Sequence, residues 1–296
     1  MASSRDIHAQ VTDRILAQIE QGVRPWVRPW STGGLGPVRP LRSTGERYRG
    51  INTLILWDAA DLAGHTAPTW ITFKQAIEAG GHVRKGETGT IVVYASTFSR
   101  SVEDQATGDS VEAEIPFLKT YSVFNVEQCD GLPAALTAKP TPASEPQRVD
   151  AAEAFVANTG ATLISGGDTA FYSHSHDVVA MPARQAFTSA EAFYSTLLHE
   201  LVHWSGADTR LKRTFGQRFA DTAYAREELV AELGAAFLCA DLGIEASPRE
   251  DHAAYLEHWI GVLKEDKRAV FQAARFASQA SDYLHGLQAP AVAAAA

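Results

Sequence analysis

Cysteine is scarce in this sequence: Cys129 and Cys239 are the only two among 296 residues, and they lie far apart. This argues against a disulfide framework and predicts a reducing cytoplasm as the location. Neither cysteine belongs to a C-x-x-C pair, so a thiolate metal site is not indicated. The chain also lacks a run of 18 apolar residues, and residues 1–13 lack the apolar core of a signal peptide. We therefore expect no membrane span and no membrane partner.

An excess of positive charge is absent as well, since the formal net charge is −9 at pH 7. A protein that coats nucleic acid with its whole surface has the opposite balance. The deficit is uneven: residues 1–130 carry 13 basic and 15 acidic residues (net −2), and residues 131–296 carry 13 and 20 (net −7). Apolar residues make up 45% of the chain and charged residues 21%, as in ordinary globular proteins. Most of the acidity therefore belongs to the second half.

One segment departs from this balance, because residues 24–49 hold six arginines and only one acid, Glu46. Arginines attract phosphates, and aromatic rings stack on unpaired bases. Proline and glycine in the same segment favour an extended, exposed chain. The candidate contacts to single-stranded DNA are Arg24, Trp26, Arg28, Trp30, Arg42, Arg47, Tyr48 and Arg49, with Lys74, Arg84 and Lys85 further along. The alternative is a solvated basic loop whose tryptophans pack into the domain.

Apolar periodicity and turn residues outline two folded regions separated by a proline-rich stretch. Before that stretch, the patterns predict helices at 6–21, 51–62 and 73–79, and strands at 69–72, 90–94 and 116–126, the last two paired as a hairpin. After it, they predict a helix at 149–158, strands near 161–164, 169–172 and 177–181, and then helices to residue 287 with a break near Gly261. We therefore predict an α+β protein of two domains, a small α+β domain at 1–130 and a mostly helical domain at 148–296, joined by a linker at 131–147.

The second half contains His199-Glu200-Leu201-Val202-His203, an H-E-x-x-H motif. Helix residues four apart point in nearly the same direction, so both imidazoles can bind one metal ion. Glu200 can then reach a metal-bound water and take its proton as general base. The capping box Thr188-Ser189-Ala190-Glu191 predicts where this helix begins, and Gly206 predicts where it ends. The motif predicts a zinc-peptidase site with His199 and His203 as ligands.

A catalytic zinc needs a third protein ligand, and a later predicted helix at 224–242 offers candidates. Glu228 and Glu232 lie four apart and interrupt an otherwise apolar face, where an acid needs a positive partner such as a metal ion. We assign Glu228 as the ligand and Glu232 as the carboxylate that holds a ligand histidine, with the reverse assignment open. Glu227 is expected on the solvated face. His252 and His258 are the other candidates for the third ligand.

Two blocks of the sequence together resemble the ArdC-type antirestriction proteins of conjugative plasmids. The first block consists of Val11-Thr12-Asp13-Arg14-Ile15, Pro25-Trp26, Tyr48-Arg49-Gly50-Ile51-Asn52, Trp70-Ile71-Thr72-Phe73-Lys74-Gln75-Ala76 and Val83-Arg84-Lys85-Gly86-Glu87. The second consists of His199-Glu200-Leu201-Val202-His203-Trp204 and Glu227-Glu228-Leu229-Val230-Ala231-Glu232. The resemblance implies a single-stranded-DNA-binding domain, a type that also precedes some plasmid DNA primases, followed by a zincin-like metallopeptidase domain.

The resemblance also implies a function, the protection of incoming plasmid DNA from host restriction. The expected partners are single-stranded DNA and a protein substrate, for which a component of a restriction system is one candidate. Zn²⁺ is the expected cofactor, although His/His/Glu sites also accept Mn²⁺ and other divalent ions. The alternative is a single-stranded-DNA-binding protein whose metal site is structural. A primase accessory module has little support, because the chain contains no polymerase motif.

Overall fold

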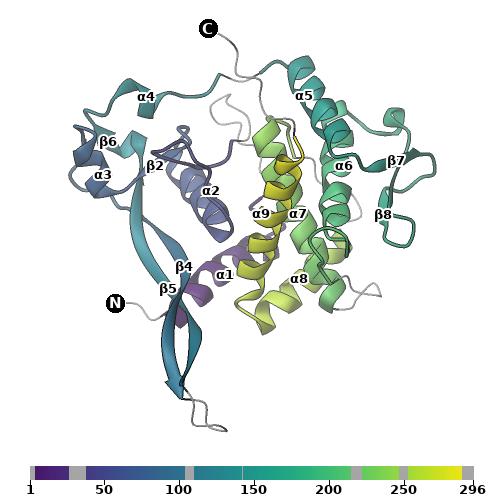
Figure 1. Cartoon of the computed structure of the whole chain (residues 1–296). Helices are drawn as coiled ribbons and strands as arrows, with labels where there is room; N and C mark the ends of the chain where they lie inside the picture. Colours follow the sequence, from purple (N-terminus) through teal and green to yellow (C-terminus); the bar gives the residue numbers. More distant parts are fainter. Residues whose placement is uncertain are drawn as a thin grey trace.

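The computed structural model describes residues 4–26, 38–103, 110–141, 143–214, 222–246 and 253–288. It confirms the predicted α+β class with two parts: an N-terminal half that contains the longest strands and a C-terminal half built mostly of helices (Figure 1). The described helices of the C-terminal half include none that is both long and apolar enough to cross a lipid bilayer.

The N-terminal half is built around a sheet of strand order β1-β2-β5-β4. Its strands are β1 (Leu41–Arg42), β2 (Thr69–Ile71), β4 (Thr90–Glu103) and β5 (Ser110–Asn125). The pair β1/β2 is parallel, and β2/β5 and β4/β5 are antiparallel. The predicted hairpin is confirmed and is longer than expected, so that β4 and β5 form a ribbon that projects from the body (Figure 1). A separate antiparallel pair joins β3 (His82–Val83) to β6 (Cys129–Asp130).

Three helices accompany this sheet: α1 (Ser4–Glu20), α2 (Ile51–Ala63) and α3 (Phe73–Glu78). Helix α2 packs on the sheet through Leu56, which is buried with Trp70 and Val92. The Asn52 side chain adds a polar tie, because it donates to the Val93 carbonyl and accepts from the Val93 amide at 2.8 and 2.9 Å. Helix α3 is capped by Thr72, whose hydroxyl accepts from the Gln75 amide in a capping box. These contacts place α2 against the base of the β4/β5 ribbon.

The stretch predicted as a linker contains the short helix α4 (Ala134–Thr137) and the first residues of α5 (Glu145–Asn158). Helix α5 begins four residues earlier than the predicted 149, because Ser144 and Gln147 form a capping box and Pro146 occupies the first turn. The two halves share one cluster of buried apolar side chains, in which Trp57 meets Phe237 edge-on at 5.7 Å. The halves are therefore packed together rather than only tethered, and the exact domain boundary stays a prediction.

The C-terminal half begins with three short strands in the order β7-β9-β8, where β7 (Thr162–Ser165) and β9 (Val178–Met181) are parallel and β8 (Phe171–Ser173) is antiparallel to β9. Its main helices are α6 (Ala190–Ser205), α7 (Thr222–Leu242), α8 (Ala253–Glu265) and α9 (Ala269–Gly286). Helix α7 packs against both α6 and α9, while α1 from the N-terminal half packs against α8. The residues of α7 from Glu227 to Ala240 are all buried as a result.

Two predicted helix boundaries were wrong. Helix α6 is capped by Ser189, whose hydroxyl accepts from the Ala192 amide at 3.0 Å, and not by Thr188. The predicted break near Gly261 lies inside α8, because a single glycine only weakens a helix. The helical conformation is instead interrupted between α8 and α9, where the Asp266 carboxylate accepts from the Arg268 amide at 2.9 Å.

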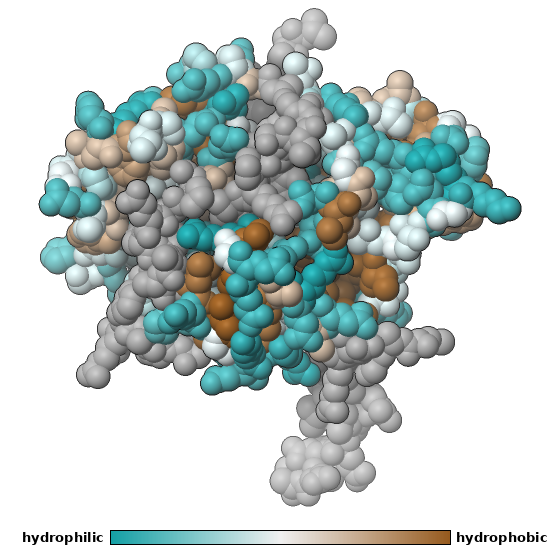
Figure 2. Space-filling model, turned by 180° about the vertical axis from the view of Figure 1, so that it is seen from behind, coloured by the Kyte–Doolittle hydropathy of each residue, from teal (hydrophilic) through white to brown (hydrophobic). Residues whose placement is uncertain are grey.

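Hydrophobic residues also reach the surface, as small patches among hydrophilic residues on the face shown in Figure 2. The large apolar side chains with the greatest exposed fractions are Leu62, Phe73, Ile77, Ile91, Tyr94, Tyr121, Leu163, Ile164 and Phe171. Scattered apolar residues are normal on a protein surface. An exposed apolar residue therefore indicates a binding site only where it lies beside other side chains that could contact the same ligand.

Candidate metal centre

Three side chains from two packed helices converge in the C-terminal half. The Nε2 atoms of His199 and His203 on α6 lie 3.2 Å apart. Glu228 on α7 approaches both, with its carboxylate oxygens 3.5 Å from His199 Nε2 and 3.4 Å from His203 Nε2. All three residues are buried, and one ligand atom from each lies within 4.8 Å of the others. Across the described ranges, this is the one cluster of histidine, cysteine and acidic side chains with metal-binding geometry.

The close approach of α6 and α7 brings these residues together, and it depends on Gly234. A Cβ atom at Gly234 would lie 2.7 Å from a methyl group of Val202 on α6, which is closer than real Cβ contacts. A larger residue at 234 would therefore force the helices apart. Because Glu228 reaches across this contact, glycine at 234 helps to set its distance from the two histidines.

A second carboxylate supports His203 from its other ring nitrogen. Glu227 Oε1 lies 3.2 Å from His203 Nδ1, and the Arg213 guanidinium grips the same carboxylate at 2.8 Å to Oε1 and 3.0 Å to Oε2. Arg213 also donates to the Ser205 hydroxyl at 3.0 Å, which ties the segment after α6 to the helix end. The expectation that Glu227 is solvated was wrong, since only 5% of Glu227 is exposed.

The acidic and basic groups of this cluster shift one another's pKa values toward their charged forms. Burial would lower the pKa of His203, but the carboxylates of Glu228 and Glu227 outweigh it and raise that pKa to about 10. Burial would raise the pKa of Glu228, but His203 and His199 hold it well below its usual range. The pKa of Glu227 is likewise lowered despite burial, by His203 and Arg213. Two ionised carboxylates beside imidazoles favour a cation, and two imidazoles with one carboxylate are the donor set of a divalent metal ion.

The other predicted site residues of this half are Glu200, Glu232, His252 and His258. Glu200 is buried on α6 between the two histidines, as the motif requires. Glu232 accepts a hydrogen bond from the Trp26 indole at 3.3 Å, while the carboxylate at His203 Nδ1 is that of Glu227. The role of Glu232 as a carboxylate that holds a ligand histidine, or as the alternative ligand, stays a prediction. His258 lies on α8 and is not part of the cluster, and His252 lies outside the described residues.

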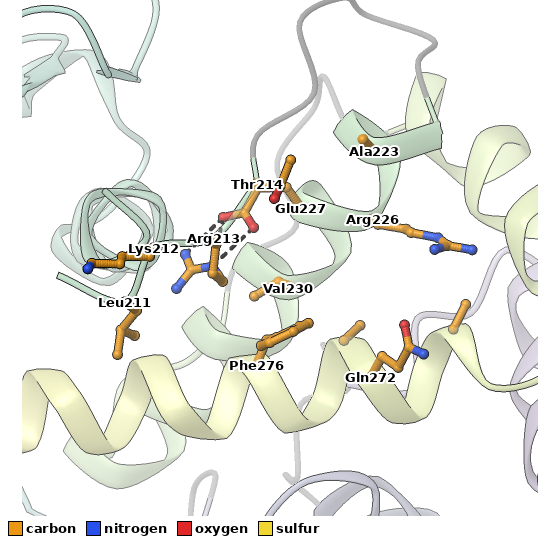
Figure 3. A pocket seen from close by; sticks show the side chains of 12 residues that line it. Leu211, Lys212, Arg213, Thr214, Ala223, Arg226, Glu227, Val230, Gln272 and Phe276 are labelled. Atoms are coloured by element: carbon orange, nitrogen blue, oxygen red, sulfur yellow. Dashed lines mark hydrogen bonds and ion pairs between the residues drawn. The ribbon is translucent and has the colours of Figure 1, made fainter. Parts of the chain in front are cut away.

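Behind the Arg213–Glu227 pair lies a cavity of about 540 Å³ between α7, α9 and residues 211–214. Figure 3 shows the pair at its wall, with Val230 and Phe276 supplying apolar lining. Arg226 and Gln272 also border it (Figure 3). Glu227 therefore stands between this cavity and His203.

The aromatic residues predicted to stack on DNA bases are placed differently from the expectation. Trp26 is 1% exposed and meets Trp259 edge-on at 5.9 Å. Tyr48 is 4% exposed, and the Arg42 guanidinium lies over its ring at 5.5 Å. In this structure neither ring offers a face to a base, which agrees with the packed alternative, and a DNA contact of these two residues stays a prediction. Arg28 and Trp30 lie outside the described residues.

Several of the predicted DNA-binding cations contact carboxylates. Arg47 pairs with Asp241 at 2.8 Å and Arg49 pairs with Asp282, both acids of the C-terminal half. Of the other described cations of this set, Arg42 contacts Glu46, Arg84 contacts Glu87 and Asp130, Lys74 contacts Glu78, Lys85 is exposed and Arg24 is half-buried. The charge of these cations is therefore partly balanced by carboxylates within the fold, and their DNA contacts stay predictions.

The converging ligands and the H-E-x-x-H helix define the C-terminal half as zincin-like, and a family model described as a zincin-like metallopeptidase matches residues 150–276. A second model, described as the N-terminal domain of the anti-restriction factor ArdC, matches residues 5–124. A crystal structure of the antirestriction protein ArdC from plasmid R388, in its metal-free form, is 42% identical. The match covers 96% of this chain and 98% of that one, with a TM-score of 0.79. The chain therefore belongs to the ArdC family of antirestriction proteins.

Other relatives extend the comparison. The Mn(II)-bound structure of the same ArdC protein is 40% identical with a TM-score of 0.77, covering 97% of this chain and 99% of that one. The uncharacterized protein y4eC of Sinorhizobium fredii (strain NBRC 101917 / NGR234) is 40% identical over 291 residues, covering 97% of this chain and 94% of that protein. The DNA primase TraC of Escherichia coli is 39% identical over 295 residues, which are 95% of this chain but only 27% of the primase. This architecture thus occurs both alone and inside a much longer primase.

Proposed function

We propose that this chain is an antirestriction protein of a conjugative plasmid that binds single-stranded DNA and hydrolyses a peptide bond at a metal site. The observation that carries the proposal is the buried cluster of His199, His203 and Glu228 with Glu200 on the same helix. Membership of the ArdC family supports the role in antirestriction. The proposed setting is a cell that receives plasmid DNA.

The metal ligands would be His199 Nε2, His203 Nε2 and the Glu228 carboxylate. We propose Zn²⁺ as the resident ion, and the Mn(II)-bound relative supports Mn²⁺ as a second candidate. When bound, such an ion polarises a peptide carbonyl and lowers the pKa of a bound water. Glu200 would accept the proton of the attacking water, while Glu227 would hold the His203 imidazole in its ligating orientation.

Single-stranded DNA is the partner proposed for the N-terminal half. The matched N-terminal model and the similarity of 95% of this chain to part of a DNA primase support this assignment. The N-terminal half also carries less negative charge than the C-terminal half, −2 against −7 as counted above, so it repels phosphates less.

The alternative is a DNA-binding protein whose metal site only stabilises the fold. The test is incubation of the purified chain with restriction-enzyme subunits, with and without single-stranded DNA, beside the matched variant Glu200→Ala. We expect cleavage by the wild type and none by Glu200→Ala, which keeps all three ligands. If the wild type cleaves no subunit and Glu200→Ala protects transferred plasmid as well as the wild type, the peptidase proposal fails and the structural metal site is favoured.

A further inference from the structure

Two exposed tyrosines and a lysine share one face of the β4/β5 ribbon. In the register of this antiparallel pair, Tyr94 lies opposite Lys119 and Val92 lies opposite Tyr121. Paired residues point to the same side, and so do residues two apart on one strand. Tyr94, Lys119 and Tyr121 therefore line the same face. Tyr94 is 52% exposed, Tyr121 is 37% exposed, and Lys119 is exposed as well.

This face continues toward Tyr48 and Arg42. Val92, on the same face as Tyr121, is buried against Tyr48 at the base of the ribbon. Burial, and after it the Tyr121 phenol, raises the pKa of Tyr48 to about 12. Arg42 lies over the Tyr48 ring, with its charge in contact with a single exposed acid, Glu46, at 3.4 Å. The buried end of the face thus carries a second cation.

The chemistry of this face matches a single strand of nucleic acid. Diagonal neighbours across an antiparallel pair lie about 7–8 Å apart, so Tyr94 and Tyr121 can each meet a different base of one extended strand. Aromatic rings stack on bases of any identity, while nearby cations neutralise phosphates. A duplex hides the faces of its bases, so rings on an exposed sheet discriminate in favour of single strands.

We propose that single-stranded DNA lies on this face of β4 and β5, with Tyr94 and Tyr121 as stacking rings and Lys119 and Arg42 as phosphate contacts. The proposal rests on the proposed single-strand binding and names its surface. It also fits a finding above: Trp26 and Tyr48 of the arginine-rich segment are buried, whereas Tyr94 and Tyr121 of the ribbon are exposed.

The test is fluorescence anisotropy of the full chain with a labelled, unstructured oligonucleotide, in single-stranded and duplex form. Tyr94→Ala and Tyr121→Ala should each weaken single-strand binding by about 5- to 150-fold, as expected for the loss of one stacked base. Tyr94→Phe and Tyr121→Phe should restore binding, because the ring remains. Phe171→Ala is the matched control, since Phe171 is 48% exposed on β8 in the other half and should have no effect.

Lys119→Ala should flatten the dependence of log affinity on log salt by about 0.7, the contribution of one phosphate contact to a single strand. If the wild type binds and both tyrosine-to-alanine variants bind equally well, this surface is wrong and the proposed DNA binding stands. If the wild type does not bind single strands at all, the DNA part of the proposed function fails and the surface with it. An equal loss on single-stranded and duplex DNA would overturn the stacking role.

Discussion

The indole nitrogen of Trp26 donates a hydrogen bond to Glu232 Oε2 across 3.3 Å, joining the N-terminal half to the helix that carries a metal ligand. Glu232 lies one turn after Glu228 on α7, so the contact ends close to the metal cluster. The Trp26 ring also packs on Trp259 of α8. The residue that composition marks as a base-stacking aromatic is therefore part of the interface between the halves.

Substitution of Trp26 should change stability before it changes DNA binding. Trp26→Phe keeps a ring but removes the donor to Glu232 and should cost about 1–3 kcal/mol of unfolding free energy. Trp26→Ala also leaves a cavity and should cost about 3–5 kcal/mol. Denaturant unfolding measures both, and Phe73→Ala is the exposed aromatic control, with little expected change. A Trp26→Ala protein of wild-type stability that no longer binds single-stranded DNA would contradict the buried role.

The second prediction concerns metal binding by the three proposed ligands. The purified chain should bind one divalent ion through His199, His203 and Glu228, and His199→Ala should abolish stoichiometric metal in elemental analysis. Metal that binds only the folded chain should also raise the melting temperature of the wild type, and less so that of His199→Ala. His258→Ala serves as control, because His258 lies outside the cluster. Full occupancy in His199→Ala would refute the ligand assignment.

Local patterns in the sequence predicted α6 and its ligand pair well, because the spacing of His199 and His203 has meaning on a single helix. They also ranked Glu228 ahead of Glu232 on α7 as the third ligand, in agreement with the cluster, but they misplaced Glu227. That helix is buried on nearly all sides, so it lacks the polar and apolar faces from which an outward residue is predicted. Glu227, expected in solvent, is buried because Arg213 and His203 supply its partners. The pairing with Arg213 depends on the path of the chain after α6, which no periodicity encodes.

The arginine-rich segment shows a similar limit: its composition gives the number of charges but not their partners in the fold. Composition counts the cations of residues 24–49 but does not show that Arg47 meets Asp241 and Arg49 meets Asp282, more than 190 residues away. The alternation of the ribbon strands did predict a hairpin, yet their register was needed to place Tyr94 and Tyr121 on one face. Local elements follow from local sequence, while partners across the fold need the tertiary structure.

The surroundings of Glu127 in the N-terminal half predict how the unfolding free energy depends on pH. Its carboxylate accepts from the Thr66 amide and hydroxyl at 2.9 and 2.8 Å and pairs with Lys139 at 2.7 Å. Burial would raise the pKa of Glu127, but these partners outweigh it and lower the pKa from 4.5 to about 2. A lowered folded pKa stabilises the fold above the unfolded value, and this contribution is lost as pH falls toward 2. The gap in unfolding free energy between wild type and Glu127→Gln should therefore be larger at pH 6 than at pH 3. Denaturant unfolding at both values measures it, and an equal gap would contradict the assignment.

The last prediction concerns the Arg213–Glu227 pair. Glu227 contacts Nδ1 of His203 but is not one of the metal ligands, so we expect the pair to act on the metal through the orientation of His203. Glu227→Gln keeps the size of the side chain but removes the charge that Arg213 grips, and should weaken metal affinity by about 10- to 100-fold. Arg213→Lys should also weaken it, since an ammonium group cannot reproduce the two-pronged contact to the carboxylate.

Arg213→Ala separates this positioning role from stability. It leaves Glu227 with less compensation for its buried charge and should cost about 3–5 kcal/mol of unfolding free energy in metal-free buffer. Arg226→Ala is the matched control: Arg226 borders the same cavity, but its side chain is 43% exposed and pairs with Asp266, so it should cost at most about 1 kcal/mol. Competition with a chelating dye measures affinity, and denaturant unfolding measures stability. If Glu227→Gln binds metal as tightly as the wild type while Arg213→Ala only destabilises the fold, the pair is a structural tie and His203 is oriented by its helix alone.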